Sequence, residues 1–598
     1  MADTYTVEIK HDKLIVAAID FGTTYSGYAI CTRDDYHKKP DDPKMLVREW
    51  NEGTYITNKA PTCVLFNPDK QFDSFGYDAL NKFRTNPDQN KNYSKWYYFE
   101  HFKMMLFKEK DILTKETMLE ESIEVKNPEH KKKMRAMDVF AAVISYFKDD
   151  LLQTEKTKGM KFTENDIQWV LTVPAIWDLK ARQFMRDAAE QAGIPRDQLI
   201  LALEPEAASM HCRRVPIGVT SDDDGGKQIA AMKIGSKYLV LDQGGGTTDI
   251  AVHEVTGMHT LKEITQACGG HWGGITVNGE FYSFLIKLLG GDVINEVKEN
   301  NPSDYFQLLY NFEHAKTSFT DDHANSPDEM QTIRVPFTWL EHFKNVTKCK
   351  LENTIKQSSY KGRVVLNKDR MRIQNSLFRS FFDYSIENVC NKMGSLLSGS
   401  ELSDVRTVLI VGGHSKSTVL TNAITKTFGN NYDIVVPKNP DIAVLKGAVL
   451  FGFDPDLITS RVSQYTYGVA MQRPYIPGVD DESKQKCLIN GLVDNVFDKH
   501  VEVGQIVNVG EFLPEHDYVP ASREYQGAHF EFYATKKKNP VYVTDEGCSC
   551  IGVLYFELTG DTNRRDMTLK LNTSGTEIVA IITERSTGKQ SQGYFSLF

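Results

Sequence analysis

The chain has 598 residues, of which 41% are hydrophobic and 25% charged, and its formal net charge is −10. This length exceeds what one hydrophobic core serves, and the acidic balance argues against a dedicated nucleic-acid-binding protein, which would carry a basic stripe. The longest early apolar run, "LIVAAI" at 14–19, is far shorter than the roughly 20 residues that span a bilayer. We therefore expect a globular protein without a membrane segment.

Nine cysteines are scattered along the chain, and the first thirteen residues are polar, without a signal-peptide core. This pattern is typical of reduced thiols in a cytoplasmic protein, with the nucleus as a second location. The one close pair is "CSC" at 548–550, and no second pair or suitably spaced histidine stands near it. We predict no zinc site there.

The first part of the chain alternates strands and helices. The run at 14–20 predicts a buried strand that ends in the glycine turn "FGTT". An amphipathic helix is expected from residue 134, with Met137, Phe140, Ile144, Phe147 and Leu151 on one face. A strand at 167–178 is interrupted by Pro174, and the following helix stops near Gly193.

A second strand, turn and strand is predicted at 237–255. It precedes a helix at 376–397, a strand at 407–411 and a closing helix at 439–452. After about residue 455 short β-rich runs alternate with turn residues, which is typical of an antiparallel sandwich. The core side of the 376–397 helix is predicted to be Phe378, Phe381, Phe382, Ile386, Val389 and Met393.

The two strand-and-turn segments form an internal repeat. Each has an apolar strand, an aspartate, one further residue, a glycine, a Thr-Thr pair and a second strand, so Asp20 matches Asp242 and Gly22 matches Gly244. In this alignment Thr23-Thr24 match Thr247-Thr248. A duplication of this kind indicates two similar domains that face each other.

The repeat favours a polyphosphate ligand. Glycine turns let backbone N–H groups approach phosphate oxygens, and threonine hydroxyls add donors. Asp20 and Asp242 at the strand ends suit a hydrated magnesium ion or a positioned water. A plain hairpin turn would explain one copy, but two copies with their acids and the later Gly412-Gly413 pair favour a phosphate clamp.

With these motifs the sequence resembles the 70-kDa heat-shock chaperones of the actin-like ATPase superfamily, in particular their divergent 12A/12B-like branch. "AIDFGTTYSGYAI" and "VLDQGGGTTDIAV" resemble the two phosphate motifs, and "LIVGGHSKSTVL" resembles the adenosine motif. The resemblance implies an α/β actin-like ATPase fold of two lobes, duplicated ribonuclease-H-like domains, followed by a C-terminal antiparallel β-sandwich. The implied domains are lobe I at 1–235, lobe II at 236–455 and the β-sandwich at 456–598.

The family binds ATP or ADP with Mg²⁺ between its lobes, and the resemblance carries these contacts to this chain. Asp20 would lie near the magnesium ion, with Asp242 and Glu204 reaching it through water. The residues implied to hold the phosphates are Gly22, Thr23, Thr24, Tyr25, Gly244, Gly245, Gly246, Thr247, Gly273 and Gly274, with Asp20 beside them.

The resemblance also implies a catalytic set. Lys103 in "FEHFKMMLF" looks like the lysine that positions the attacking water, although a solvated helix lysine is the alternative. Glu204 would reach the metal or the water, Asp242 would orient the water or act as base, and Thr247 would complete the group. Pro174 and Arg182 resemble a pair that relays the nucleotide state to the next domain.

The nucleoside end departs from the family pattern. Thr317 and Lys416 stand where the family has two arginines that sandwich adenine, and threonine cannot stack while lysine stacks less well than guanidinium. This puts adenine affinity in doubt and leaves phosphate binding supported. The residues implied for the nucleoside pocket are Glu313, Lys316, Gly412, Gly413, Lys416 and Asp441.

Three further departures concern partners. Ile200 and Leu203 replace polar residues of a segment near the J-domain contacts, so cooperation with J-domain co-chaperones is doubtful. The interdomain linker retains only Leu457 and Ile458 of the usual leucine run. The chain stops at Phe598, just after the sandwich, so a helical lid is not expected.

The leading hypothesis is an ATP-binding, slowly hydrolysing chaperone-like protein whose β-domain binds protein or peptide clients under nucleotide control. The alternative is a nucleotide-regulated scaffold or adaptor without refolding activity, with signalling proteins as partners. A sugar or acetate kinase of the same superfamily is a third reading, in which the C-terminal sandwich would have no role. We expect neither nucleic acid nor membrane as a partner.

Overall fold

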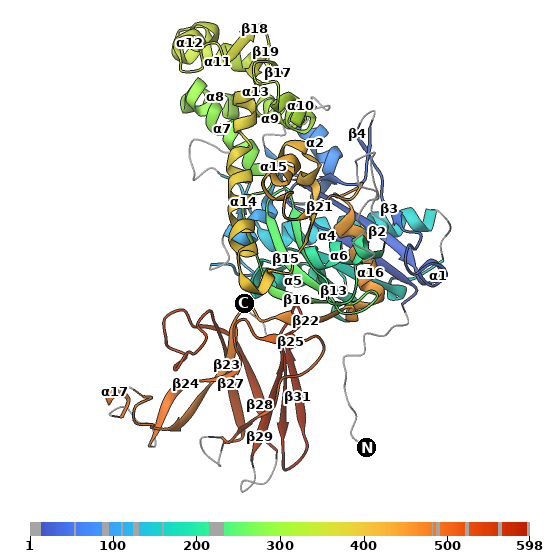
Figure 1. The fold of residues 1–598 in the computed structure, drawn as a ribbon, viewed down its shortest axis with the longest axis vertical. Helices are drawn as coiled ribbons and strands as arrows, with labels where there is room; N and C mark the ends of the chain where they lie inside the picture. Colours follow the sequence, from blue (N-terminus) through green and yellow to red (C-terminus); the bar gives the residue numbers. More distant parts are fainter. Residues whose placement is uncertain are drawn as a thin grey trace. The chain divides into compact units, whose positions relative to one another are not determined.

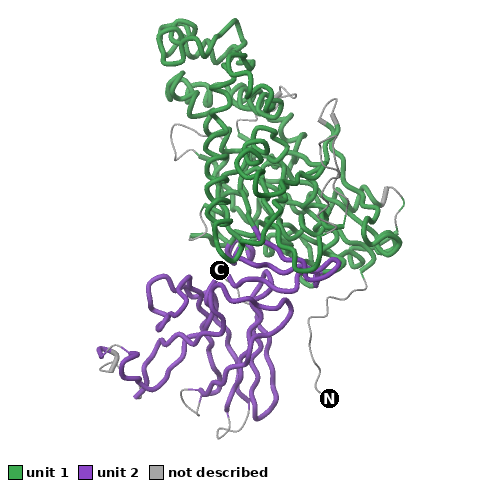
Figure 2. Tube along the Cα trace, in the orientation of Figure 1, with its two compact units in different colours: residues 1–177, 184–250, 267–454 green, residues 178–183, 251–266, 455–598 purple. Residues whose placement is uncertain are grey.

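The computed structural model divides into two compact units, which are coloured separately in Figure 2. Unit 1 comprises residues 1–177, 184–250 and 267–454, and unit 2 comprises residues 178–183, 251–266 and 455–598. Among the described residues, no helix has both the length and the apolar character needed to cross a membrane. The structure describes residues 13–594 apart from 53–54, 86–94, 109–111, 123–130, 158, 160, 215–231, 481, 486–490, 521–524 and 560–564.

The first sheet of unit 1 has the strand order β13-β12-β1-β2-β3, and β6 also pairs with β2. Every residue of β1 and β12 is buried, as expected for central strands covered on both faces. β1 pairs in parallel with β12 and antiparallel with β2. The strands are β1 (Ile15–Asp20), β2 (Tyr25–Thr32), β3 (Leu46–Val47), β6 (Ala60–Pro61), β12 (Ile167–Val173) and β13 (Leu199–Leu203).

The helices expected in the first part of the chain are confirmed. Helix α4 (Ala136–Thr157) buries the whole apolar face predicted for it, and β12 ends just before Pro174. Helix α5 (Leu179–Gln191) stops before Gly193, whose φ of +81° favours glycine. The predicted closing helix, α16 (Ala443–Phe453), packs on β1, β12 and α6 (Glu204–Arg214), far away in sequence.

The second sheet continues the repeat, with the order β21-β20-β14-β15-β16. β14 pairs in parallel with β20, as β1 does with β12, and Asp242 lies opposite Val411. The boundary between the two units falls within β15 and β16. The strands are β14 (Lys237–Gln243), β15 (Thr248–Val255), β16 (Leu261–Gly270), β20 (Thr407–Val411) and β21 (Asp433–Val435).

Helices cover this second sheet and extend beyond it (Figure 1). The helix predicted at 376–397 is broken near Phe381 and Phe382 into α13 and α14, but its six predicted core residues are all buried, so that prediction is confirmed. These helices are α7 (Gly274–Leu289), α8 (Gly291–Asn300), α9 (Pro302–Ser318), α10 (Asp321–Ala324), α11 (Phe337–Thr347), α12 (Leu351–Gln357), α13 (Asn375–Ser380), α14 (Asp383–Leu397) and α15 (Thr418–Phe428).

Shorter elements complete unit 1. Strands β17, β18 and β19 form one antiparallel sheet, and β7, β8 and β9 form another. Their bounds, with those of the remaining short elements, are α1 (Arg33–Lys38), β4 (Trp50–Glu52), β5 (Tyr55–Thr57), β7 (Cys63–Phe66), β8 (Phe72–Phe75), α2 (Gly76–Thr85), β9 (Tyr97–Glu100), α3 (Met105–Lys108), β10 (Met118–Glu120), β11 (Lys133–Arg135), β17 (Met330–Arg334), β18 (Val364–Asn367) and β19 (Arg370–Gln374).

Unit 2 is built mainly from two antiparallel four-stranded sheets, β24-β23-β27-β28 and β26-β29-β30-β31 (Figure 1). Its polypeptide also forms β22 (Ile458–Val462), which pairs with β16 and with β25 (Ile506–Asn508), so the linker residue Ile458 begins a strand. The other elements are β23 (Thr466–Pro474), α17 (Glu482–Gln485), β24 (Leu492–Val501), β26 (His516–Tyr518), β27 (Gly527–Thr535), β28 (Ser549–Glu557), β29 (Met567–Asn572), β30 (Val579–Glu584) and β31 (Gln590–Tyr594).

One hydrophobic core joins the two sheets of unit 2. β27 contributes Phe530, Phe532 and Ala534, which alternate with more exposed residues, the period expected of a strand with one buried face. β29 contributes Leu569 and Leu571 from the other sheet. Leu179, from the 178–183 segment, packs against the same core.

Candidate functional site

The two glycine turns have the same local construction. A Cβ on Gly22 would lie 2.1 Å from the carbonyl oxygen of Tyr25, and a Cβ on Gly244 would lie 3.0 Å from that of Thr247. Each glycine therefore starts a tight turn whose fourth residue folds back over it. This geometry corrects one detail of the sequence alignment, because Thr23-Thr24 occupy the turn positions of Gly245-Gly246 and not those of Thr247-Thr248.

The structure brings these turns face to face. A Cβ on Gly245 would lie 2.0 Å from Oγ1 of Thr24, and a Cβ on Gly246 would lie 2.7 Å from Oγ1 of Thr23. Side chains are thus excluded from the second turn at the point where the first turn approaches it. The two halves of the repeat form a single cradle whose floor is backbone.

Helix α7 closes this cradle from a third side. The N–H of Gly274 donates to the carbonyl of Gly244 at 3.2 Å, and the N–H of Ile275 donates to that of Gly245 at 2.8 Å. A Cβ on Gly273 would lie 2.6 Å from the Gly245 carbonyl oxygen. The Gly273-Gly274 pair therefore fixes the second turn at the N-terminus of a sixteen-residue helix, a position that favours anions.

Charged side chains gather beside the cradle in two ion pairs. Nζ of Lys103 lies 2.9 Å from Oε1 of Glu204 and 4.9 Å from the centroid of the Trp177 ring. Nζ of Lys59 lies 2.5 Å from Oδ2 of Asp20. The Lys103 side chain is only 3% exposed, so the solvated-lysine alternative is wrong.

Asp20 has a partner for each carboxylate oxygen. Oδ2 faces Lys59, and Oδ1 accepts a hydrogen bond of 2.9 Å from Thr172 on β12. Lys59 is a site residue that sequence reasoning missed, because nothing in "ITNKAPT" distinguishes it from a solvated loop lysine.

The other buried carboxyls are Asp242, Asp249 and Glu204, and electrostatic repulsion among them adds to the effect of burial on the pKa values of Asp242 and Asp249. Burial, with the charges of Glu204, Asp249 and Asp20, raises the pKa of Asp242 well above its usual range. Burial and Glu204 raise the pKa of Asp249 to about 7, and burial raises the pKa of Glu204 despite Lys103. If all four acids were ionised, their charge of −4 and the +2 of Lys59 and Lys103 would leave −2. A bound divalent cation would neutralise that charge.

Asp249 is the second residue that sequence reasoning missed. It closes the "GGGTTD" motif, and its Oδ1 accepts the N–H of Ile176 at 3.0 Å. The signal was present in the sequence, since an acid buried in a strand directly after a phosphate turn is rarely structural alone.

The nucleoside end is built from side chains. Nζ of Lys316 lies 2.7 Å from Glu313, 2.9 Å from Oδ1 of Asn278 and 3.2 Å from the Gly274 carbonyl oxygen. Nζ of Lys416 pairs with Asp441 at 2.6 Å, and the Lys416 side chain is 58% exposed. The side chains predicted for the nucleoside are thus engaged with one another.

Gly412 and His414 shape the wall between the two ends. Gly412 has φ +91°, and a Cβ there would lie 2.4 Å from Oδ1 of Asp242. His414 lies parallel to Phe382 at 6.5 Å between ring centroids, and burial lowers its pKa to about 3. Its buried Nε2 has no hydrogen-bond partner among the described residues, so a polar group of a ligand would satisfy it.

These features line one cavity of about 520 Å³ in unit 1. Gly273 is the one residue of the predicted set outside its lining, because it packs behind the second turn. Ile56, Lys59, Tyr77, Thr317, Phe382 and His414 line the cavity as well. The predicted residues in its lining are Asp20, Gly22, Thr23, Thr24, Tyr25, Lys103, Glu204, Asp242, Gly244, Gly245, Gly246, Thr247, Gly274, Glu313, Lys316, Gly412, Gly413, Lys416 and Asp441.

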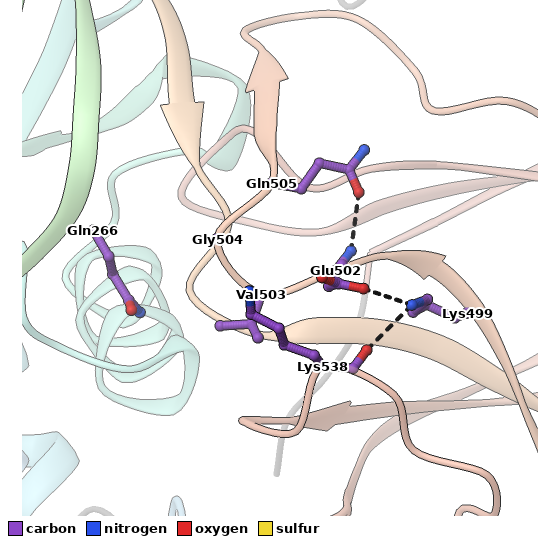
Figure 3. Close-up of a pocket in the computed structure, with 7 residues that line it drawn as sticks. All are labelled: Gln266, Lys499, Glu502, Val503, Gly504, Gln505 and Lys538. Atoms are coloured by element: carbon purple, nitrogen blue, oxygen red, sulfur yellow. Dashed lines mark hydrogen bonds and ion pairs between the residues drawn. The ribbon is translucent and has the colours of Figure 1, made fainter. Parts of the chain in front are cut away.

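A separate cavity of about 580 Å³ lies in unit 2 (Figure 3). Nζ of Lys499 lies 2.7 Å from Oε2 of Glu502 and donates a hydrogen bond of 2.8 Å to Oδ1 of Asn539. No residue of the predicted site lies there. Its lining residues are Gln266, Lys499, Glu502, Val503, Gly504, Gln505 and Lys538.

Two opposed glycine turns stand at the ends of duplicated strands, with buried acids and lysines beside them, an arrangement that fits a two-lobed actin-like ATPase fold. The Hsp70 protein family model matches residues 16–357. The chain belongs to the Hsp70 family and is an ATP-binding protein of that family. Membership of this family contradicts the alternative of a sugar or acetate kinase.

Two relatives match nearly the whole chain. Heat shock 70 kDa protein 12A of Mus musculus is 32% identical over 98% of this chain and 92% of the relative. Heat shock 70 kDa protein 12B of Homo sapiens is 30% identical over 96% of this chain and 90% of the relative. Chaperone protein DnaK of Mycoplasmopsis synoviae (strain 53) is 24% identical over 58% of this chain and 50% of its own length. The chain is thus similar to the 12A/12B branch throughout.

Proposed function

We propose that this chain binds ATP with Mg²⁺ in the unit 1 cavity, hydrolyses it slowly, and uses its nucleotide state to control client binding by unit 2. The observation that carries the proposal is the approach of Gly245 and Gly246 to Thr24 and Thr23, at distances that leave no room for a Cβ. A backbone cradle of this kind suits a phosphate tail, because its N–H groups can approach phosphate oxygens.

The residues fit a nucleotide and its metal. The cradle excludes side chains, the buried carboxyls lie close enough to raise the pKa of Asp242, and the unpartnered Nε2 of His414 offers a polar contact. Asp20, Asp242 and Glu204 would hold a hydrated Mg²⁺, largely through water. When bound, Mg²⁺ neutralises charge on the phosphate tail and on these carboxylates.

Within this proposal the chain's own residues supply positioning and charge. Lys103, held by Glu204 and by the Trp177 ring, presents a buried ammonium that orients the attacking water and counters developing negative charge. Asp242, at the carboxyl end of β14, orients that water or accepts its proton. Gly244, Gly245, Gly246 and Thr247 align the phosphate tail for in-line attack, and the Thr247 hydroxyl adds a donor.

The nucleoside end supports weaker base recognition. Glu313 and Lys316 would contact ribose and adenine, and Gly412, Gly413 and Asp441 would complete the pocket. Thr317 and the salt-bridged Lys416 line the cavity where the family has stacking arginines. Binding energy is therefore concentrated on the phosphates.

A short segment links the site to unit 2. The Ile176 N–H is bonded to the buried Asp249, the Trp177 ring faces Lys103, and Leu179, two residues further on, packs on the unit 2 core. A change of charge at the phosphates thus acts on a segment that is covalently continuous with unit 2. We propose that this segment, with Pro174 and Arg182, carries the nucleotide signal.

We propose that unit 2 is a β-sandwich like the peptide-binding β-domain of the family and that it binds extended protein segments by strand addition. Its two antiparallel sheets around one core support this assignment. The clients would be cytoplasmic proteins or peptides, with weak dependence on J-domain partners. The alternative, a scaffold for folded signalling proteins, is favoured by the altered segment at Ile200 and Leu203.

Phosphate release from γ-labelled ATP tests the enzymatic part of the proposal. We expect slow release by the full chain, and release reduced by about 10²–10³-fold in Lys103→Ala and Asp242→Ala proteins. Release equal to the buffer blank in all three proteins would refute hydrolysis.

A pull-down with and without ATP distinguishes the two proposed functions of unit 2. Binding of unfolded model peptides indicates a chaperone, whereas binding of one folded partner indicates a scaffold.

A further inference from the structure

A compact polar cluster lies in unit 2 and includes no residue of the proposed nucleotide site. Asp498 and His500 stand two residues apart on β24, and His516 and Tyr518 stand two residues apart on β26. Residues two apart on a strand share one face. Each strand therefore presents a pair of side chains, and the four side chains meet.

The distances between these side chains are those of potential ligands. Nδ1 of His516 lies 2.9 Å from Oδ2 of Asp498, and Nε2 of His500 lies 3.9 Å from the same oxygen. The ligand atoms of Asp498, His500 and His516 all lie within 4.8 Å of one another. The two imidazole rings are stacked at 3.9 Å between centroids, so the histidines of the two strands are in direct contact.

Burial also suits a metal ligand. The His500 residue is 7% exposed. Its Nε2 lies 2.9 Å from the Tyr518 hydroxyl, but its buried Nδ1 has no hydrogen-bond partner among the described residues, which leaves one ring nitrogen for a ligand.

We propose that Asp498, His500 and His516 form a binding site for Zn²⁺ that clips β24 to β26. Two imidazole nitrogens and one carboxylate oxygen are a common zinc donor set, and three protein ligands leave a fourth position for water. The Tyr518 hydroxyl bonds to Asp498 and lies 2.9 Å from Nε2 of His500, so it contacts both of these residues.

The position of the site gives the metal a structural role. β24 is the edge strand of one four-stranded sheet, and β26 is the edge strand of the other. β26 has only three residues, and it pairs with β29. A zinc ion held by both strands would tie the edges of the two sheets together.

The experiment uses the full chain, freed of metal with a chelator and dialysed, without nucleotide. Zn²⁺ alone is titrated by calorimetry into wild type, His516→Ala, Asp498→Asn and, as a matched control, His529→Ala. His529 is exposed on β27 of the same unit and lies outside the cluster. We expect one zinc per chain for wild type and for the control, and affinity reduced more than about 100-fold in the two cluster variants.

Cobalt supplies a readout that a purely structural role would not give. Co²⁺ bound by two imidazoles and a carboxylate absorbs visible light by d–d transitions, and the His516→Ala protein should lack this band while its metal-free circular dichroism matches wild type. Excess Zn²⁺ should raise the thermal unfolding midpoint of wild type by about 5 °C and leave that of His516→Ala unchanged. Equal zinc affinity in wild type and in both cluster variants would overturn the proposal. Zinc binding that Cys548→Ser or Cys550→Ser abolishes would overturn it too, because the metal would then bind at the cysteines.

Discussion

The two ends of the unit 1 cavity are built from different materials. At the phosphate end, backbone meets backbone and small side chains so closely that a Cβ on Gly245 would lie 2.0 Å from Thr24. At the nucleoside end, the wall consists of long side chains in ion pairs, such as Lys416 with Asp441. Backbone contact tolerates no substitution, whereas paired side chains can rearrange. In the proposed function, phosphate recognition is therefore fixed by the fold and base recognition is adjustable.

The largest effect is expected from filling the cradle. Gly245→Ala places a methyl group against Thr24, so the two turns must separate, and we expect MgATP affinity to fall more than about 100-fold. Calorimetric titration measures this. Gly279→Ala is the control, because a Cβ at this exposed position of α7 meets nothing within 4 Å. A Gly245→Ala protein that binds MgATP like the control would show that the cradle does not hold phosphate.

The second largest effect is expected from removing a lysine, because the loss of stability should differ between the two ends of the cavity. Lys103→Ala leaves Glu204 buried without its partner, and we expect a loss of about 3–5 kcal/mol in the free energy of unfolding. Lys416→Ala breaks an exposed pair and should cost at most about 1 kcal/mol. Denaturant unfolding of both variants gives the two values.

A second substitution checks the cause. Adding Glu204→Gln to the Lys103→Ala protein removes the orphaned charge and should restore much of the lost stability. Equal losses for Lys103→Ala and Lys416→Ala, without this rescue, would show that burial of the first pair is not what distinguishes the two ends.

The third expected effect is a dependence of stability on pH. The pKa of Asp249 is about 7 in the folded chain, above the value of about 3.9 for an unfolded aspartate. The folded state therefore holds a proton that the unfolded state has lost, and this contribution is present below about pH 4 and lost as pH rises to about 7. Asp242, whose pKa is also raised, adds in the same direction.

Asp249→Asn isolates this contribution, because asparagine keeps an acceptor for the Ile176 N–H. Without nucleotide, the unfolding midpoint of wild type should fall relative to that of Asp249→Asn between about pH 4 and pH 7. Thermal unfolding across this range gives the difference. A difference that stays constant with pH would contradict the assignment.

The smallest effect is expected at the nucleoside end. Thr317→Arg with Lys416→Arg restores two planar guanidinium groups to the cavity wall, and we expect ATP affinity to rise only about two- to fivefold. Titration with ATP and with inorganic tripolyphosphate separates base stacking from general attraction of anions. An equal rise for both ligands would show that the new arginines act on the phosphates.

The phosphate end was readable from the sequence because glycines in a strand-turn-strand repeat have a local cause. Asp20, Gly22 and Gly244 follow apolar runs directly, and the structure places them where the pattern predicts. The alignment of Thr23-Thr24 with Thr247-Thr248 was wrong because it matched identical residue types and not equivalent positions in the two turns. The helix predicted at 376–397 is broken at Phe381 and Phe382. The spacing of the six apolar residues predicts which face is buried, but it does not reveal that the helix axis changes there.

Other features depend on contacts between distant segments. Lys59 reaches Asp20 from 39 positions away, and no local pattern indicates that it does so. The zinc ligands were missed for the same reason, because Asp498 and His516 are 18 positions apart on strands of different sheets. Spacing rules find ligands on one turn or hairpin, and this cluster forms only when two sheet edges meet.

The most direct test of the central claim is a calorimetric comparison of MgATP, MgGTP, magnesium tripolyphosphate and adenosine with the full chain. If the phosphate end carries the binding energy, ATP and GTP should bind within about tenfold of each other, tripolyphosphate should bind measurably, and adenosine should bind at least about 100-fold more weakly than ATP. Adenosine that binds as tightly as ATP, with no detectable binding of tripolyphosphate, would contradict the account.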